Sequence, residues 1–453
     1  MARPARSVCL IGGGIDSLCL GYYLQKNTCS NVTLLSLKRR CPFVNTHYYD
    51  SQVLETGWYY SFVQGSESSL LSSLLRDLRA EGDVVESNRY SSSISFIDEH
   101  GKIYKVSKFL PNIFFFLLRN YFFGKSVYID KYERLNSFIS KHIDDKICNN
   151  LIFPYCYHYF GFSPRHVLMG SYFHSFVERT KEENKSLVKW LISRHNTDEK
   201  KSSFFIKKKK NVKFRGGNII LAKKIKDHLQ LCSNTRWVGN VQNLQVRCKR
   251  GSIQVRIGRE VLKCEEVILC LNPLELKTIL KRKHFHLKNK HILIKFLSNF
   301  CANKIKIANV CYRKNILPFS HSLESLLLFK QNEMNNVISM LYDSHIFPQV
   351  DENNPVKSPF ETSLRFMSFQ CDEKKCKEEI KTFLRDILKV KEHPDLVVSN
   401  NFSVFPFDER LDRMFKQLLK KRCKKLKIFW TFSFFKNMEY CLSEAQKLSR
   451  DYA

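Results

Sequence analysis

Several patterns are missing from this sequence of 453 residues, and each absence excludes a class of protein. No apolar run approaches the roughly 20 residues that a helix needs to cross a bilayer, so we expect no transmembrane helix. The sixteen cysteines are scattered, contain no C-x-x-C motif and follow no signal peptide. We therefore expect reduced, buried thiols rather than the disulfide framework of a small secreted protein.

Metal-ligand patterns and repeats are absent as well. Cys371 and Cys376 have no second pair at zinc-ligand spacing, and His284 and His286 lie among basic residues without a third ligand. The sequence therefore predicts no metal site. There is no internal repeat, and the only biased tracts are short lysine runs, of which residues 207–210 are typical of a solvated loop.

Acidic residues are scarce: 43 aspartates and glutamates stand against 75 lysines and arginines, which gives a formal net charge of +32. Such a surface favours anionic partners, which include phospholipid headgroups, nucleic acid and carboxylate-bearing ligands. No nucleic-acid recognition module is present, so we expect no nucleic-acid partner. With 43% hydrophobic and 13% aromatic residues, the chain should form a small number of globular domains with large cores.

The N-terminal segment carries the strongest local pattern. An apolar strand over residues 8–11 leads into three glycines and then a helix. The helix has an apolar face at the spacing i, i+3, i+4, i+7, formed by Ile15, Leu18, Cys19 and Tyr22. This order offers backbone N–H groups and a helix N-terminus to a dinucleotide pyrophosphate. Of the G-x-G-x-x-G pattern, Gly12 and Gly14 are present and Ser17 replaces the third glycine.

The following part of the chain alternates between strand and helix patterns. A second strand over residues 32–35 ends at Ser36, where an acidic residue that binds a ribose is usual. Residues 69–81 have a leucine-rich helical face, residues 91–106 alternate as short strands, and residues 109–195 are mainly helical.

A second strong signal begins at Phe214. A Gly216-Gly217 turn precedes a helix, and three alternating segments then predict a meander of strands. These segments are residues 235–246, 252–257 and 260–271, and the last closes on the apolar run 267–273. Further on, residues 337–342 predict a strand and residues 377–389 a helix.

These features, in this order, resemble the FAD-dependent amine-oxidase superfamily and, within it, the protoporphyrinogen oxidase family. Four further segments carry the resemblance. They are the R-G-G helix region 214–229, the strand opened by Trp237 and Val238, the L-Y-D-S-H-I-F-P segment 341–348, and the C-terminal helix with Cys441, Leu442 and Glu444. The resemblance covers most of the chain. It implies an α/β (α+β) fold with a Rossmann-like FAD-binding domain, an inserted substrate domain and a helical membrane-binding region.

The resemblance also implies an order of domains. The FAD-binding domain is expected in three parts, residues 1–90, 206–280 and 416–453. A helical region that binds substrate and membrane is expected at 91–205, and a substrate domain at 281–415.

Site residues follow from the same resemblance. The positions that match cofactor contacts are Gly12, Gly14, Ile15, Ser36, Arg40, Gly57 and Val238. Leu328 matches a leucine that packs against the substrate. Because the flavin carries the redox chemistry, no side chain is implied as a catalytic acid or base. Asp343, in the Y-D-S segment, is predicted to be a turn or hydrogen-bonding residue.

Several of these positions depart from the family pattern. Ser17 and Ser36 replace a glycine and an acidic residue. Bulky side chains stand where small ones are usual, namely Phe43, Tyr59 and Trp430. The aromatic residues of the segment 429–435 are therefore predicted to occupy cofactor volume unless the register shifts. An arginine that faces substrate carboxylates aligns near Ser95, and Leu326 replaces a glycine.

Two functions are consistent with these observations. The resemblance implies oxidation of protoporphyrinogen IX to protoporphyrin IX by dioxygen through FAD, in haem biosynthesis. The alternative is a catalytically inactive, flavin-free homologue that keeps the fold and acts as a basic, membrane-associated binding protein.

Residues 108–125 predict a contact with a membrane surface. Their phenylalanines and leucines are flanked by lysines and an arginine, and each basic residue near an anionic surface contributes about 1 kcal/mol. A buried core helix is the alternative. The resemblance implies peripheral attachment to the mitochondrial inner membrane and allows a homodimer. Residues 1–7 are basic but too few for a cleavable transit peptide, so none is expected.

Overall fold

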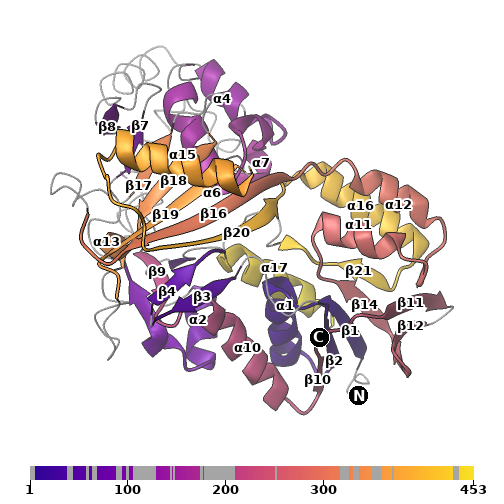
Figure 1. The fold of residues 1–453 in the computed structure, drawn as a ribbon. Helices are drawn as coiled ribbons and strands as arrows, with labels where there is room; N and C mark the ends of the chain where they lie inside the picture. Colours follow the sequence, from indigo (N-terminus) through magenta and orange to yellow (C-terminus); the bar gives the residue numbers. More distant parts are fainter. Residues whose placement is uncertain are drawn as a thin grey trace, which may run out of the picture.

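The computed structural model describes most of the chain, in separate segments. The described residues are 6–37, 44–50, 52–57, 61–63, 69–87, 94–97, 102–105, 129–142, 145, 148–173, 177, 210–249, 252–316, 326–329, 336–347, 359–369, 372–431 and 438–452. Two large sheets dominate this architecture, as Figure 1 shows.

The first is a parallel sheet that joins distant parts of the chain. Its order is β10 (Thr235–Val238), β2 (Asn31–Ser36), β1 (Ser7–Gly12), β14 (Glu266–Leu269) and β21 (Leu426–Ile428), and all neighbours are parallel. β1 lies in the middle and is buried after its first residue. Strands covered on both faces read as continuous apolar runs, which is why β1 and β14 show little alternation.

Helices cover both faces of this sheet. On one face lie α1 (Ile15–Asn27), α10 (Ile219–Leu231) and α17 (Met438–Arg450). On the other lie α11 (Pro273–Lys281), α12 (Lys290–Leu297) and α16 (Glu409–Arg422). Successive residues of a strand point to opposite faces, so Leu10 packs in the first core and Ile11 in the second. The predicted Rossmann-like α/β class is confirmed.

The predicted meander is partly wrong. Its strands are β11 (Leu244–Lys249), β12 (Ser252–Ile257) and β13 (Glu260–Cys264), with β15 (Phe285–His286) paired to β11. The segment 235–246 divides because the backbone turns at Asn240, with a φ of 54°, and β10 pairs with β2 instead. The segment 260–271 divides near Glu265, since the buried residues of β14 belong to the parallel sheet.

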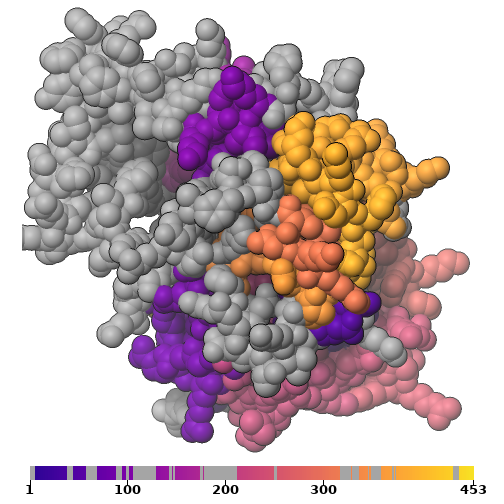
Figure 2. Space-filling model, turned by 60° about the vertical axis from the view of Figure 1, so that its left-hand side comes forward, coloured from indigo at the N-terminus to yellow at the C-terminus, as the bar shows by residue number. Residues whose placement is uncertain are grey.

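The second large sheet has seven strands. Its order is β20 (Leu396–Val404), β16 (Asn303–Tyr312), β19 (Thr362–Phe369), β18 (Val337–Tyr342), β17 (Leu326–Phe329), β7 (Ile94–Ile97) and β8 (Ile103–Lys105). Neighbours are antiparallel except β17 and β7. α15 (Glu373–Asp386) packs Ile380 and Phe383 on one face, and Figure 2 shows this helix, in orange, at the molecular surface. The strand predicted at 337–342 and the helix predicted at 377–389 are confirmed.

The remaining elements are short. The helical ones are α2 (Leu70–Asp77), α4 (Leu135–His142), α6 (Phe153–Phe160), α7 (Met169–Tyr172), α13 (Asp343–Ile346), a π-helix (Cys148–Ile152) and the 3-10 turns Glu81–Asp83 and Pro164–His166. The strands are β5 (Ser61–Val63), β6 (Val84–Glu86) and β9 (Lys210–Phe214) in one sheet, and the hairpin β3 (Thr46–Tyr49) and β4 (Gln52–Glu55). The helix at 69–81 is confirmed. The lysine run is not a loop at Lys210, which begins β9, and 207–209 lie outside the described residues.

The described cysteines are all free thiols, as predicted. Most are buried, but the prediction of burial is wrong for Cys29 and Cys301, which are exposed. Within the described ranges, no helix has the length and apolar character needed to span a membrane. The segment 108–125 lies outside these ranges.

Candidate functional site

The C-terminal ends of β1, β2 and β10 meet at one edge of the parallel sheet. The register pairs Gly12 with Ser36 and Leu35 with Val238, and Gly14 and Ile15 follow as the N-cap and first residue of α1. Five of the residues assigned from the family resemblance are therefore brought together: Gly12, Gly14, Ile15, Ser36 and Val238. Ligands of open α/β sheets bind at this edge, outside the carboxyl ends of the strands.

Close backbone approach explains the glycines of this turn. A Cβ on Gly12 would lie 2.4 Å from the backbone oxygen of Cys270. Gly13 has a φ of 114°, and a Cβ there would lie 2.2 Å from the Ser36 Oγ. The middle glycine is therefore the most constrained, although the G-x-G-x-x-G pattern does not specify it. The run of three glycines was the signal for it in the sequence.

Ser17 is accommodated without distortion of the helix. Its hydroxyl accepts a hydrogen bond from the Gly13 N–H (3.0 Å) and donates one to the Gly14 C=O (2.7 Å). The side chain folds back into the first turn and is buried. Among the described residues, no side chain caps the N-terminus of α1. The N–H of Gly13 is thus used within the chain, while the helix N-terminus keeps uncapped donors for an anion.

Asp16 links this turn to the C-terminal part of the chain. Its carboxylate accepts hydrogen bonds from the Thr431 hydroxyl (2.8 Å) and the Cys441 thiol (3.5 Å). The carboxylate is buried in the first turn of α1, where the helix dipole stabilises a negative charge. The sequence pattern did not indicate this role, because both partners are more than 400 residues away.

The prediction that Trp430 occupies cofactor volume is wrong. Its indole ring stacks on Phe415 at 5.3 Å between centroids and meets Phe300 at 5.4 Å. The Nε1–H donates to the Asp412 carboxylate (2.8 Å). The side chain therefore fills the core beneath α12 and α16, on the face of the sheet away from α1. The structure describes 429–431 but not the rest of the segment 429–435.

The other assigned residues are placed as follows. Gly57 is buried directly after β4, and the neighbouring Thr56 C=O accepts a hydrogen bond from Asn400 (3.4 Å). Leu328 is 0% exposed in a small core with Phe96 and Leu341, so it contacts the chain itself rather than open space. Ser95 is buried too, 2% exposed on β7. Arg40, Phe43 and Tyr59 lie outside the described residues.

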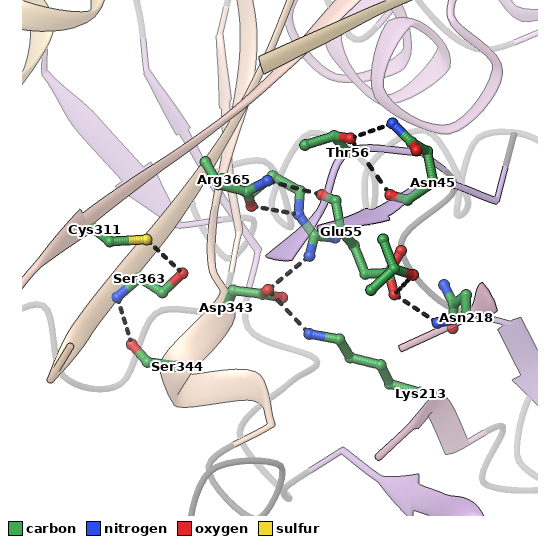
Figure 3. Close-up of polar contacts among 12 residues, drawn as sticks. Asn45, Glu55, Thr56, Lys213, Asn218, Cys311, Asp343, Ser344, Ser363 and Arg365 are labelled. Carbon is green, nitrogen blue, oxygen red and sulfur yellow. Dashed lines mark hydrogen bonds and ion pairs between the residues drawn. The ribbon is translucent and has the colours of Figure 1, made fainter. Parts of the chain in front are cut away.

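A buried ion cluster, drawn in Figure 3, joins the smaller sheets to the seven-stranded sheet. The Asp343 carboxylate, just after β18, accepts hydrogen bonds from Lys213 of β9 (3.2 Å) and Arg365 of β19 (2.6 Å). All three side chains are at most 7% exposed. Burial by itself raises the pKa of Asp343, but the two cations outweigh it and hold this pKa below its ordinary value. The prediction that Asp343 is a hydrogen-bonding residue is confirmed.

Glu55 lies beside this cluster and is fully buried. Its Oε1 accepts hydrogen bonds from the Asn218 N–H (2.5 Å) and the Thr46 hydroxyl (2.8 Å), whereas Oε2 has no partner among the described residues. Burial raises the pKa of Glu55, and the charge of Lys213 opposes that rise only in part. A hydrogen bond from Asn309 to the Glu55 C=O (2.9 Å) holds this strand end against β16.

Glu55→Gln is expected to gain stability relative to the wild type as pH rises from about 4 to 7. A carboxyl whose pKa is raised in the folded state stabilises the fold below its unfolded pKa of about 4.3 and loses that contribution as pH rises through the folded pKa. Glutamine does not titrate and keeps the two acceptor contacts. Urea unfolding at several pH values measures the difference.

The matched control for this prediction is Glu260→Gln. Glu260 is exposed, and its ion pair with Arg236 lowers its pKa. As pH rises, the free energy of unfolding of Glu260→Gln relative to that of the wild type should therefore change in the opposite direction, by a small amount. The prediction would be contradicted if the free energy of unfolding of Glu55→Gln had the same pH dependence as that of the wild type.

Metal binding has no support in the described parts of the chain, where no group of three or more His, Cys, Asp or Glu side chains is placed to hold an ion. His284, just before β15, and His286, within it, are both exposed.

Sequence comparisons find no match: no protein-family model and no curated protein matches the chain. Solved structures do match. A protein of Exiguobacterium sp. 255-15 named "putative protoporphyrinogen oxidase" superposes with a TM-score of 0.75 at 12% identity, over 100% of this chain and 99% of its own. Cyclohexylamine oxidase from Brevibacterium oxydans gives a TM-score of 0.63 at 12% identity, over 99% of both chains.

Reduced UDP-galactopyranose mutase gives a TM-score of 0.68 at 11% identity, over 99% of this chain and 93% of that protein. Likeness extends over whole chains in all three cases, although the identities are low. The chain therefore has the fold of the amine-oxidase-type flavoproteins.

Proposed function

We propose that this protein is an FAD-dependent oxidoreductase that oxidises a porphyrinogen with dioxygen. The observation that carries the proposal is the glycine turn at the carboxyl edge of β1, β2 and β10, which leads into an uncapped helix. The fold shared with the flavoproteins above supports it. The porphyrinogen substrate rests on the segment 341–348 and on the name of the Exiguobacterium protein.

The residues at this edge fit an adenine dinucleotide. Gly13 leaves no side chain in the turn, the Ser17 hydroxyl is folded into the helix, and the Trp430 indole lies in another core. The backbone N–H groups of Gly14 and Ile15 would hold the pyrophosphate, and Ser36 would hydrogen-bond a ribose. A hydroxyl lacks the charge assistance of the usual acidic residue, which makes this contact weaker.

FAD, when bound, accepts reducing equivalents from the substrate and passes them to dioxygen. The chain supplies orientation. Asn309 and Asn400 hydrogen-bond the backbone of Glu55 and Thr56, so the strand end before Gly57 is fixed against β16 and β20 of the seven-stranded sheet. The same hairpin bonds the N-terminal residues of α10 through Glu55 and Thr46, so it connects that helix to the seven-stranded sheet.

Location at a membrane belongs to the same proposal. The segment 108–125 would attach the protein peripherally to an anionic surface, and by resemblance this surface would be the mitochondrial inner membrane. Porphyrinogens carry propionates, and the basic net charge of +32 favours such ligands.

The test is flavin content, followed by turnover. Purified protein is expected to be yellow and to contain about one FAD per chain, and added protoporphyrinogen should yield fluorescent protoporphyrin with uptake of dioxygen. Protein that is colourless and takes up no added FAD would overturn the proposal. Protein that binds FAD but leaves protoporphyrinogen unchanged would overturn the substrate while retaining the oxidoreductase.

One observation favours a second function, that of a flavin-free homologue with the same fold. The Ser17 hydroxyl uses the N–H of Gly13, so the turn has fewer free donors than a complete G-x-G-x-x-G turn has. This function predicts a folded, colourless protein whose thermal unfolding temperature does not change when FAD is added.

A further inference from the structure

A pocket lies at the opposite edge of the parallel sheet from β10. It has a volume of about 440 Å³ and is lined by residues of β21, α16 and α17. β21 is the last strand of the sheet, and β14 separates it from β1 and the glycine turn. The pocket is therefore distinct from the edge at which the dinucleotide is proposed to bind. Its volume is within the range of small-molecule sites.

Cations dominate the lining. Five lysines and two carboxylates, Glu444 and Asp451, contribute to it. Three of the lysines have acidic partners: Lys416 with Asp412 at 2.9 Å, Lys427 with Glu266 at 2.9 Å and Lys447 with Glu444 at 2.7 Å. For Lys420 and Lys424, the described residues provide no ion pair. The positive charges of these two ammonium groups are therefore available to a ligand.

The outer edge of β21 adds a hydrogen-bond donor. The Lys425 C=O and the Phe429 N–H bond to β14, and alternate residues of a strand direct their backbone groups to opposite sides. The N–H of Ile428 therefore faces the outer edge, beyond which the described residues add no further strand to this sheet. Leu419, Leu426 and Ile428 are buried and provide an apolar floor.

The lysines are spaced for more than one anionic group. Lys416 and Lys420 are four residues apart on α16, which corresponds to a rise of about 6 Å along the helix. Lys424 follows after the helix ends at Arg422. A single carboxylate satisfies one ammonium, whereas a chain of phosphates has several charged oxygens at successive positions. Both helices end near this pocket, and helix C-termini do not attract anions, so the lysines must supply the attraction.

We propose that this pocket binds a small molecule with two or more linked phosphates, held by Lys420 and Lys424 over the edge of β21. Thr431, which also lines the pocket, donates a hydrogen bond to Asp16 in the first turn of α1. This hydrogen bond connects the pocket to the glycine turn, although the two sites bind different ligands.

The simpler explanation is that the lysines only complement the C-terminal end of α16. Lysines in the last helical turn are common for that reason. This explanation predicts weak, unsaturable binding of anions that depends on the total charge of the protein. It makes no distinction between Lys420 or Lys424 and any other exposed lysine.

The experiment is titration calorimetry of the full chain with inorganic triphosphate, at constant ionic strength and in the presence of excess FAD. We expect one saturable site. Lys420→Ala/Lys424→Ala should lower the affinity at least about tenfold, and Lys420→Arg/Lys424→Arg should retain it. The control Lys374→Ala/Lys391→Ala removes the same charge from exposed positions elsewhere and should change the affinity less than about twofold.

Two results would overturn the proposal. Absence of saturable binding to the wild type does so, as does an equal loss in the two alanine pairs, which would indicate attraction by net charge alone. Titration with ATP distinguishes the sources of the phosphates: tighter binding than triphosphate indicates a nucleotide, and equal binding indicates a free polyphosphate. A Gly13→Ala variant should retain the triphosphate site, because the glycine turn takes no part in it.

Discussion

Asp343→Asn is expected to lower the free energy of unfolding by about 3–5 kcal/mol. The substitution keeps the shape of the side chain but removes the carboxylate that forms ion pairs with both Lys213 and Arg365 in the cluster of Figure 3. The two buried cations then lose their ion-pair partner, and Glu55, whose pKa is raised by burial, offsets the cost of their desolvation only in part. Urea unfolding at neutral pH, with wild type and variant measured side by side, gives the difference.

Asp386→Asn is the matched control. Asp386 also forms an ion pair with an arginine, Arg385, but both side chains are exposed, so its removal should have a negligible effect. If Asp343→Asn and Asp386→Asn lowered the free energy of unfolding by a similar small amount, the cluster would contribute no more to stability than a surface ion pair does.

The loss in Asp343→Asn should depend on pH. The pKa of Asp343 is lowered in the folded state, so its stabilising contribution is present above the unfolded pKa of about 3.9 and disappears as pH falls through the folded pKa. The difference between the variant and the wild type is therefore largest at neutral pH and shrinks in acid. A constant difference from pH 7 to pH 3 would contradict this assignment.

Gly13→Ala is expected to reduce bound FAD from about one per chain to near zero. The new Cβ would lie 2.2 Å from the Ser36 Oγ and 2.9 Å from the Ser36 Cα, so the turn must move away from β2. Its φ of 114° adds backbone strain of roughly 1–3 kcal/mol for a residue with a side chain. Flavin absorbance per chain measures the content, and circular dichroism checks that the variant is folded.

Gly258→Ala provides the control for backbone strain. Gly258 also has a positive φ, 59°, but a Cβ there meets nothing within 4 Å, and the position lies in the meander. This variant should keep its FAD. If Gly13→Ala is folded and binds FAD as the wild type does, the turn does not hold the cofactor and the proposed function loses its main support.

The outcome for Gly13→Ala also separates the two candidate functions. For an FAD-dependent enzyme, the substitution removes colour and activity together. For a flavin-free homologue, the wild type is already colourless, and the substitution changes only stability. Both results are readable from the same pair of purified proteins.

The local parts of the fold were predictable because their information is local. The strand, the three glycines and the first helix occupy one continuous stretch, and apolar periodicity distinguishes the strand from the helix. α2 and α15 were predicted for the same reason. Strand boundaries between 235 and 271 were not, since residues of similar character enter two different sheets there.

The position of Trp430 shows what a sequence alignment alone leaves open. Its place in the chain suggested a side chain beside the cofactor. Side chains alternate between the two faces of the sheet along β21 and the residues that follow, and this alternation decides the face on which each one lies. The indole therefore lies beside Phe300 and Phe415. A change of one residue in register would reverse this result.

The glycine turn and the alternation of strands and helices can be read from the residues alone because they depend on near neighbours, and the basic charge because it depends only on composition. Tertiary structure alone decided that Lys213, Asp343 and Arg365 form a buried cluster and that Asp16 bonds Thr431. These contacts join segments far apart in the chain, and the order and register of the sheets bring them together. No local pattern encodes such distances, since they result from how the whole chain buries its apolar surface.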